Sequence, residues 1–98
     1  MNRNKSYNQE LSEKLKNHRF AQGYLLALME GEEGLKVEDA LRHTIERMGI
    51  KEFSELADIP SSNVVEFLKG KRKLKPETLD SYLSPFHLRT RLILEKAY

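Results

Sequence analysis

The sequence predicts an all-α domain of five or more helices, and two observations support this prediction. Apolar residues recur at intervals of three and four, which is the spacing that lines one face of a helix. No alternation of β-branched residues persists long enough to indicate a strand. Ninety-eight residues are enough for one hydrophobic core and too few for two, so residues 1–98 are expected to form a single domain.

Residues 1–34 are predicted to form an amino-terminal helical extension. Leu11 and Leu15 lie one turn apart in a first helix of about two turns. The second helix carries an apolar stripe that consists of Phe20, Ala21, Tyr24, Leu25 and Leu28. The segment "EGEEG" at 30–34 ends it, because Gly31 and Gly34 are good helix terminators. We expect Tyr7, Phe20, Tyr24 and Leu28 to pack the extension on the rest of the domain; the alternative is a surface for a partner protein.

Residues 35–84 are predicted to contain four more helices. The first of them has an apolar stripe made of Val37, Leu41, Ile45 and Met48, and it ends at Gly49. Two short helices follow, one with Phe53, Leu56 and Ala57 and one with Val64, Phe67 and Leu68, the latter closed by Gly70. Pro76 suits the first turn of the fourth helix, where its missing N–H does no harm. The buried side of that helix consists of Leu79, Tyr82 and Leu83.

Residues 85–98 are predicted to form a carboxy-terminal helix after Pro85. Its apolar flank consists of Leu88, Leu92 and Ile93. An apolar flank that nothing else in the chain covers tends to bind a partner. These three residues are therefore the predicted contacts of a homodimer.

Composition excludes several classes of protein. The chain has no cysteine, which rules out disulfides, thiolate metal sites and cysteine nucleophiles. No apolar run approaches the roughly 20 residues of a membrane span. The first ten residues, "MNRNKSYNQE", lack the apolar segment of a signal peptide. We therefore expect a cytoplasmic protein with no membrane contact.

The sequence contains no recognisable catalytic or metal-binding pattern. Ser61, Ser62 and Ser84 have no associated base and orienting group, and the glycines form neither a phosphate loop nor a dinucleotide fingerprint. His43 and Glu46 would share a helix face, yet two ligands without a third or fourth make no metal site. We expect no enzymatic activity, no metal and no cofactor.

The distribution of charge is more informative than the net charge of +2. Basic and acidic side chains cancel over residues 1–49, and residues 50–68 carry a net charge of −3. Five cations without an acid then follow within residues 69–75, namely Lys69, Lys71, Arg72, Lys73 and Lys75. An anion is expected to bind this segment; the alternative is a solvated basic surface.

The segment from Ile50 to Gly70 has the apolar spacing of two short helices joined by a tight turn. With Ile50 as the first position, positions 4, 8, 10, 15 and 18 are apolar, and they are Phe53, Ala57, Ile59, Val64 and Phe67. Ser54, at position 5, is small, as the close crossing of two helices requires. This spacing predicts a helix-turn-helix.

The same residues resemble a known family. "FSELADIPSSNVVEFLKGKR", followed by "PETLDSYL", resembles the Cro/repressor-type (XRE) helix-turn-helix. The upstream segment "YLLALMEGEEGLKVEDALRHTIERMGI" is similar to the one that precedes this motif in addiction-module antidote proteins, the HigA-like antitoxins. The resemblance spans roughly residues 7–83 and implies a Cro/repressor-like domain with extra amino-terminal helices. It also implies a transcriptional regulator that binds its own operator in double-stranded DNA, with a cognate toxin as a second partner or, as a prophage-type repressor, without one.

Three features depart from the family pattern. Asp58 stands at the turn position that is usually glycine, and aspartate tolerates the left-handed conformation better than most residues. Pro60 replaces the usual serine or threonine cap, which leaves Ser61 or Ser62 to offer a capping oxygen. The second helix of the motif, the recognition helix, is poor in long polar donors.

The family correspondence assigns roles on the recognition helix and after it. The residues placed toward the bases are Ser61, Ser62, Val65 and Glu66, with Asn63 and Lys69 at the margins. Serine discriminates bases weakly, valine packs on a thymine methyl and glutamate accepts a hydrogen bond from cytosine N4. Lys69, Lys71, Arg72, Lys73 and Lys75 would bind phosphates, which sets affinity and register rather than sequence choice. We therefore expect the protein to hold DNA firmly and to read it weakly.

Other roles stay open for these residues and for the domain. Val65 is equally suited to a core or partner contact, and Glu66 to a solvated position or an ion pair with Lys69. The alternative function is a protein-binding inhibitor or scaffold that has a helix-turn-helix fold and does not read DNA, which the negative charge of residues 50–68 favours. The sequence lacks the long polar tail with which many antitoxins wrap their toxins, so a toxin contact would have to use folded surface.

Overall fold

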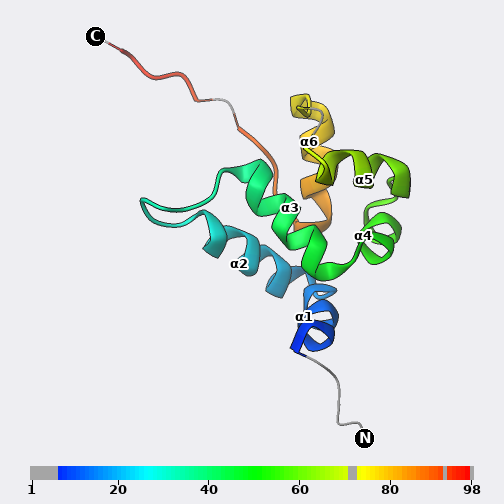
Figure 1. Ribbon diagram of the computed structural model, residues 1–98. Coiled ribbons are helices and arrows are strands. Elements are labelled where there is room, and N and C mark those ends of the chain that lie inside the picture. Colours follow the sequence, from blue (N-terminus) through cyan, green and yellow to red (C-terminus); the bar gives the residue numbers. More distant parts are fainter. Residues whose placement is uncertain (1–6, 71–72, 92, 98) are drawn as a thin grey trace, which may run out of the picture.

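A computed structural model describes residues 7–70, 73–91 and 93–97 (Figure 1). In this part of the chain all regular secondary structure is helical, which confirms the predicted all-α class. The α-helices are α1 (Tyr7–Leu15), α2 (His18–Met29), α3 (Val37–Met48), α4 (Ile50–Ala57), α5 (Ser61–Leu68) and α6 (Pro76–Leu83), and a 3-10 helix, η1, spans Ser84–Phe86. None of the helices in the described residues is long and apolar enough to cross a membrane.

The turn between α2 and α3 lies where the sequence predicts it. Asn17 caps the start of α2, because its side-chain oxygen accepts hydrogen bonds from the N–H groups of Arg19 and Phe20. Beyond the end of α2, Gly31 has a φ of 83°, which side chains with a Cβ rarely adopt. Gly34 lies so close to the carbonyl of Met29 that a Cβ would overlap it. The chain therefore reverses direction here, and α2 and α3 are antiparallel (Figure 1).

The amino-terminal extension packs directly on α3. Leu11 and Leu15 of α1 and Ala21 and Leu25 of α2 are buried in the same cluster as the stripe of α3. The Ser12 hydroxyl donates to the carbonyl of Met48 at 2.6 Å, which ties α1 to the last turn of α3. Burial of each leucine stabilises the fold by about 1.5–3 kcal/mol, so the extension is part of the domain's core.

Two residues that were expected in this core are on the surface. Tyr7 is 75% exposed and Phe20 is 41% exposed. The buried stripe of α2 runs through Ala21 and Leu25, which leaves Phe20 at its edge, and Tyr7 is the first residue of α1. Tyr24 and Leu28 are half-buried and pack against the core as expected.

An aromatic cluster joins the second half of the domain. The ring centroids of Phe53 and Tyr82 lie 5.7 Å apart, those of Phe53 and Phe86 5.9 Å, and those of Phe67 and Tyr82 5.0 Å. These rings come from α4, α5, α6 and η1 and are all buried. Aromatic pairs at such distances add about 0.5–1.5 kcal/mol beyond their buried area. The cluster therefore fixes α5 and α6 against α4.

The carboxy-terminal helix predicted for residues 85–98 is not present in the described part of that segment. η1 ends at Phe86, the next residue, His87, has a left-handed φ of 58°, and residues 88–91 and 93–97 have no regular structure. A helix would need the N–H of Thr90 to bond the carbonyl of Phe86. Instead, that N–H donates to Asp80 at 2.7 Å, and that carbonyl accepts from Gln22 Nε2 at 3.0 Å. Both groups are thus used in tertiary contacts, and the chain then runs away from the helices (Figure 1).

Candidate nucleic-acid interface

The turn between α4 and α5 is held by two hydrogen bonds between Ser54 and Ile59. Asp58 has a φ of 57° and a ψ of 46°, which confirms the left-handed conformation predicted for the turn. The N–H of Ile59 donates to the carbonyl of Ser54 at 3.1 Å, and the Ser54 hydroxyl donates to the carbonyl of Ile59. Ser54 is small enough for α4 and α5 to approach each other closely. Its hydrogen bonds with Ile59 also stabilise the turn that follows α4.

The apolar positions predicted for the helix-turn-helix are confirmed. Phe53, Val64 and Phe67 are buried, and Ala57 and Ile59 are half-buried and pack against the core cluster. Gly70 follows α5 with a φ of 70°, and its N–H donates to the carbonyl of Phe67 at 3.0 Å. The positions of α4 and α5 therefore follow from the apolar pattern.

The start of α5 differs from the prediction. No side chain caps this helix, so the expectation that Ser61 or Ser62 supplies a capping oxygen is wrong. Both serines lie inside the helix, after Pro60, where their oxygens do not reach the N–H groups that a preceding residue would cap. The Ser61 hydroxyl donates instead to the Ser54 hydroxyl at 3.3 Å.

The five residues predicted to face bases lie together on α5. Ser61, Ser62, Asn63 and Glu66 are exposed. Val65 is half-buried and is not one of the residues that pack against the core cluster. Because Val64 and Phe67 take the buried side of the helix, these residues form its outer, mostly polar side.

Three of the predicted phosphate-binding residues lie next to this side of α5. Lys69 follows α5 directly, Lys75 precedes α6, and both are exposed, as is Lys73 between them. Lys71 and Arg72 lie outside the described residues. Glu66 and Lys69 do not form the ion pair that their spacing allows.

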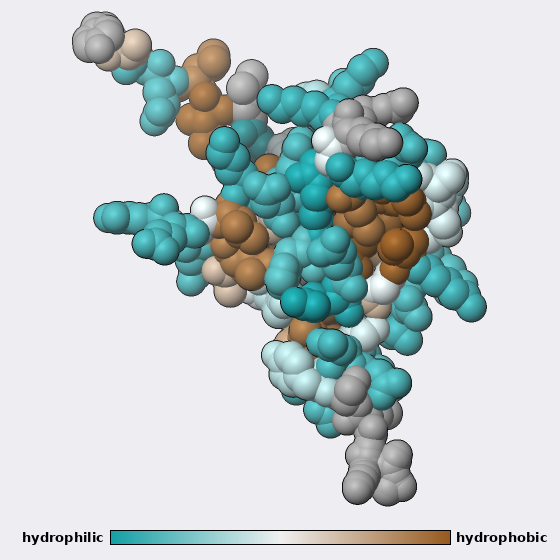
Figure 2. Space-filling model, in the orientation of Figure 1, coloured by the Kyte–Doolittle hydropathy of each residue, from teal (hydrophilic) through white to brown (hydrophobic). Residues whose placement is uncertain are grey.

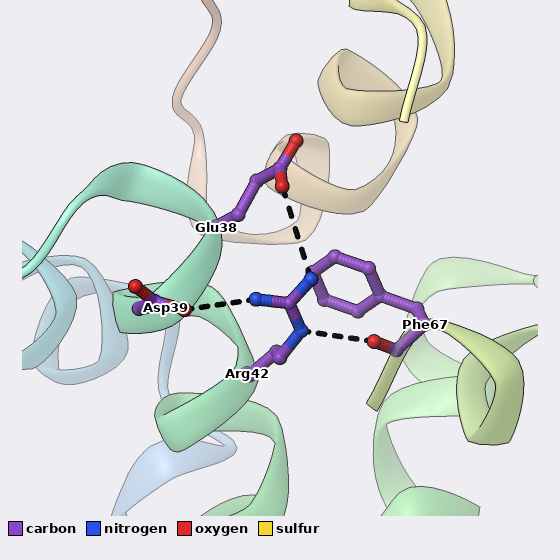
Figure 3. Close-up of polar contacts among 4 residues, drawn as sticks. All are labelled: Glu38, Asp39, Arg42 and Phe67. Atoms are coloured by element: carbon purple, nitrogen blue, oxygen red, sulfur yellow. Dashed lines mark hydrogen bonds and ion pairs between the residues drawn. The ribbon is translucent and has the colours of Figure 1, made fainter. Parts of the chain in front are cut away.

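Arg42 of α3 anchors the end of α5 (Figure 3). Its Nε donates to the carbonyl of Phe67 at 2.9 Å, and its guanidinium carbon lies 4.7 Å from the centre of the Phe67 ring. Asp39 Oδ1 is 2.9 Å from Nη1, and Glu38 Oε1 is 3.8 Å from Nη2. The positive charge of Arg42 near the Phe67 carbonyl also interacts favourably with the partial negative charge at the end of a helix. Sequence reasoning missed this residue, although acids three and four positions before an arginine were a usable signal.

A groove of about 600 Å³ separates α5 from the start of α6. Its lining includes Asn63 and Glu66 from the outer side of α5 and Lys73 and Lys75 from the connection to α6. Phe67, Leu74, Thr78 and Tyr82 complete the lining. The structure thus brings predicted base-facing and phosphate-binding residues to one surface depression.

The predicted dimer contacts are not brought together on a helix. Leu88 is half-buried against the core of its own chain, and Leu92 lies outside the described residues. Ile93 is 70% exposed, and its neighbour Leu94 is 88% exposed. The apolar surface of this segment therefore lies on an extended chain.

Histidine and carboxylate residues of the described chain do not form a group of three or more that would hold a metal ion. Instead, His43 is stacked on Tyr24, with ring centroids 6.1 Å apart.

Comparison of the chain with protein-family models, curated proteins and solved structures finds no match in any of the three. The residues of the site are therefore the basis for a proposed function.

Proposed function

We propose that the protein is a cytoplasmic DNA-binding transcriptional regulator of the XRE helix-turn-helix type, the antidote of a toxin–antitoxin module or a prophage-type repressor. One observation carries the proposal: the outer side of α5 is uncovered and polar, and exposed Lys69, Lys73 and Lys75 follow it. In helix-turn-helix proteins the second helix enters the major groove of DNA. In this protein α5 is that helix.

The chemistry of the interface favours affinity over discrimination. Each phosphate that a lysine engages adds about −0.9 to the slope of log affinity against log salt. The side chains on α5 offer fewer base contacts, since Ser61 and Ser62 discriminate weakly and Glu66 can only accept a hydrogen bond, as from a cytosine amino group. Glu66 also repels phosphates. Because Lys69 does not form an ion pair with Glu66, it does not neutralise the charge of this carboxylate. Lys71 and Arg72 would add phosphate contacts.

Operator binding of this kind requires two recognition helices about 34 Å apart, one DNA turn, and hence a homodimer. In the described part of the carboxy-terminal segment, Ile93 and Leu94 are exposed large apolar residues and would form the dimer contact. Leu88 is not available for it, because it already packs on its own core.

Fluorescence anisotropy tests the proposal. Duplexes that tile the region upstream of the gene are titrated with protein across a salt series, beside a scrambled duplex. Tight binding to one tile supports a sequence-reading regulator. Equal and steeply salt-dependent binding to all duplexes would mean that the lysines hold DNA and α5 does not read it. No binding at low salt contradicts the proposal.

A charge-reversal variant identifies the interface. Changing Lys69, Lys73 and Lys75 to glutamate should abolish binding and flatten the salt slope. The matched control changes three other exposed lysines, Lys16, Lys36 and Lys96, to glutamate. The control has the same net charge and should retain most of the affinity, so loss in both variants would point to general electrostatics instead of this surface.

A protein-binding module is the second candidate, and exposed apolar residues favour it. Phe20 is 41% exposed, Leu26 42% and Leu56 48%. Figure 2 shows apolar areas over α2 and α3 and between α4 and α5. A toxin that binds here should be released by Phe20→Glu with Leu26→Glu, measured by co-purification with the product of the neighbouring gene. Retained binding by this variant would exclude the α2 surface.

A further inference from the structure

Tyr82 is a buried tyrosine whose hydroxyl has no hydrogen-bond partner among residues 7–70, 73–91 and 93–97. The residue is 3% exposed, and its ring packs on Phe53 and Phe67. None of the residues that the structure describes forms a hydrogen bond with its hydroxyl. Buried hydroxyl groups usually have a partner, because an unpaired one keeps the full cost of desolvation. Burial raises the pKa of Tyr82 above its ordinary value, so the hydroxyl keeps its proton at neutral pH and is available as a donor.

The missing partner belongs in the groove between α5 and α6, which Tyr82 lines. Tyr82 lies four residues after Thr78, so the two share one face of α6. Side chains on a helix lean toward its amino terminus, which directs the hydroxyl toward the first turn of α6. A ligand at that turn would therefore reach it.

The first turn of α6 is suited to an anion. The N-cap residue, Lys75, offers no side-chain acceptor, and the N–H groups of Glu77 and Thr78 have no intrahelical acceptor. Lys73 and Lys75 line the same groove and are exposed. Free N–H groups, the helix dipole and ammonium groups all favour negative charge at this end of the groove.

The opposite wall has different chemistry. Asn63 and Glu66 of α5 line it, and Phe67 and Leu74 supply apolar surface to the groove. The carboxylate of Glu66 accepts hydrogen bonds and repels anions. A volume of about 600 Å³ lies within the range of small-molecule sites. The groove thus fits a molecule that is anionic at one end and donates hydrogen bonds at the other.

We propose that the groove between α5 and α6 binds a small phosphate-bearing molecule. Its phosphate lies against the first turn of α6, where Lys73, Lys75 and the Tyr82 hydroxyl contact it. Its far end donates hydrogen bonds to Glu66 and Asn63. Nucleoside monophosphates and sugar phosphates have this chemistry.

Such a ligand would also control access to α5. The ligand would contact four groove residues that also belong to the proposed DNA interface, namely Asn63, Glu66, Lys73 and Lys75. Ligand and DNA would then exclude each other, and the phosphate-bearing molecule would act as an effector that releases the operator. This regulatory part depends on the proposed DNA-binding function, whereas the binding site itself does not.

NMR of the full ¹⁵N-labelled chain in phosphate-free buffer tests the site. Inorganic phosphate, adenosine 5′-monophosphate, adenosine and duplex DNA are titrated separately. We expect phosphate and the monophosphate to shift the amide signals of Glu77 and Thr78 with saturation, the monophosphate at lower concentration. Adenosine should not shift them.

Variants assign the contacts. Tyr82→Phe removes only the hydroxyl and should weaken monophosphate binding about tenfold. Its melting temperature should equal or exceed that of the wild type, because none of the described residues bonds to the hydroxyl that is removed. Tyr24→Phe, outside the groove, is the matched control and should bind normally. Lys75→Gln should weaken binding, and Lys51→Gln on α4 should not.

Three outcomes would overturn the proposal. They are no saturable shift at about 10 mM of either phosphate compound, equal affinity of Tyr82→Phe and wild type, and shifts of Glu77 and Thr78 by duplex DNA alone. The last would mean that the groove takes DNA phosphates. If the monophosphate binds and no duplex does, the proposed function fails and the site stands. If both bind without competing, only the regulatory part fails.

Discussion

Arg42 links α3 to the end of α5. It donates to the carbonyl of Phe67, stacks on the Phe67 ring and is oriented by Glu38 and Asp39. With about 1 kcal/mol or more for the hydrogen bond and about 0.5–1 kcal/mol for the cation–π contact, Arg42→Ala should lower the free energy of unfolding by about 1–2 kcal/mol. Arg42→Lys should recover only part of this loss, since lysine lacks the planar fork.

Urea unfolding measures the effect of the Arg42 variants. Arg47→Ala, on the exposed side of α3, is the matched control and should cost about 0.5 kcal/mol or less. Equal losses in Arg42→Ala and Arg47→Ala would show that the contacts with Phe67 do not stabilise the fold.

Asp80 makes the attachment of the carboxy-terminal segment dependent on pH. The backbone N–H and the hydroxyl of Thr90, both at 2.7 Å, hold the pKa of this carboxyl below its ordinary 3.8, and Arg89 acts in the same direction against desolvation. Because the folded state has the lower pKa, the contribution to stability is complete above the unfolded value and is lost as pH falls through the folded one.

We expect the Thr90 amide signal in NMR to titrate with a midpoint below 3.8 and to report release of the segment in acid. Asp80→Asn should abolish this titration and speed hydrogen exchange of the Thr90 amide at neutral pH. A midpoint at or above 3.8 in the wild type would contradict the assignment.

The turn between α4 and α5 contains a residue that is not optimal for its conformation. Asp58 adopts a φ of 57°, which glycine takes without steric cost. Asp58→Gly should therefore stabilise the fold by about 0.5–1 kcal/mol in thermal unfolding, whereas Asp58→Val should destabilise it by more than that. Asp58→Asn keeps the tolerance for this conformation and removes a charge next to α5. It should raise DNA affinity at nearly constant stability, and unchanged affinity would show that the carboxylate does not repel DNA.

At the scale of helices, the sequence predicts α1 to α6 because each has an apolar stripe and a recognisable end. Gly31, Gly49 and Gly70 take positive φ values beyond helix ends, and Pro76 starts α6. The carboxy-terminal helix fails although "HLRTRLILEKAY" has helical spacing. The first turn of that helix would need the Phe86 carbonyl and the Thr90 N–H. Gln22 donates to this carbonyl, and Asp80 accepts from this N–H. These tertiary hydrogen bonds involve residues that lie far apart in the sequence. The periodicity of a local segment therefore does not predict them.

The candidate site is predictable only in part for a similar reason. The outer residues of α5 follow from the positions of Val64 and Phe67, which fix its buried side. Three features depend on how helices meet: the Ser61 contact with Ser54, the contacts of Arg42 with Phe67, and the burial of the Tyr82 hydroxyl without a partner among the described residues. Sequence spacing within one helix does not determine those contacts.

At the scale of the whole molecule, the extension and the helix-turn-helix share one hydrophobic cluster. Leu15 of α1 is fully buried in it, at 0% exposure. Leu15→Ala should cost about 2–5 kcal/mol, and it should destabilise α5 as much as α1 if the domain unfolds as one unit. Hydrogen exchange of amides in α1 and α5 measures this. Leu26→Ala, at a residue that is 42% exposed on α2, is the control. Faster exchange confined to α1 and α2 would show two independent units.

Association of two chains is the remaining whole-molecule prediction, and it depends on the proposed homodimer. Ile93 and Leu94 are 70% and 88% exposed on an extended segment, where water contacts two large apolar side chains. Burial of both in a dimer would contribute about 1.5–3 kcal/mol for each side chain. Ile93→Glu with Leu94→Glu should therefore shift the protein to monomer in sedimentation equilibrium and weaken binding to a two-site operator more than to a single half-site. Arg91→Glu, at an exposed neighbour whose charged head group stays in water, should leave the dimer intact. A wild-type protein that stays monomeric at high concentration would remove this segment as the dimer contact.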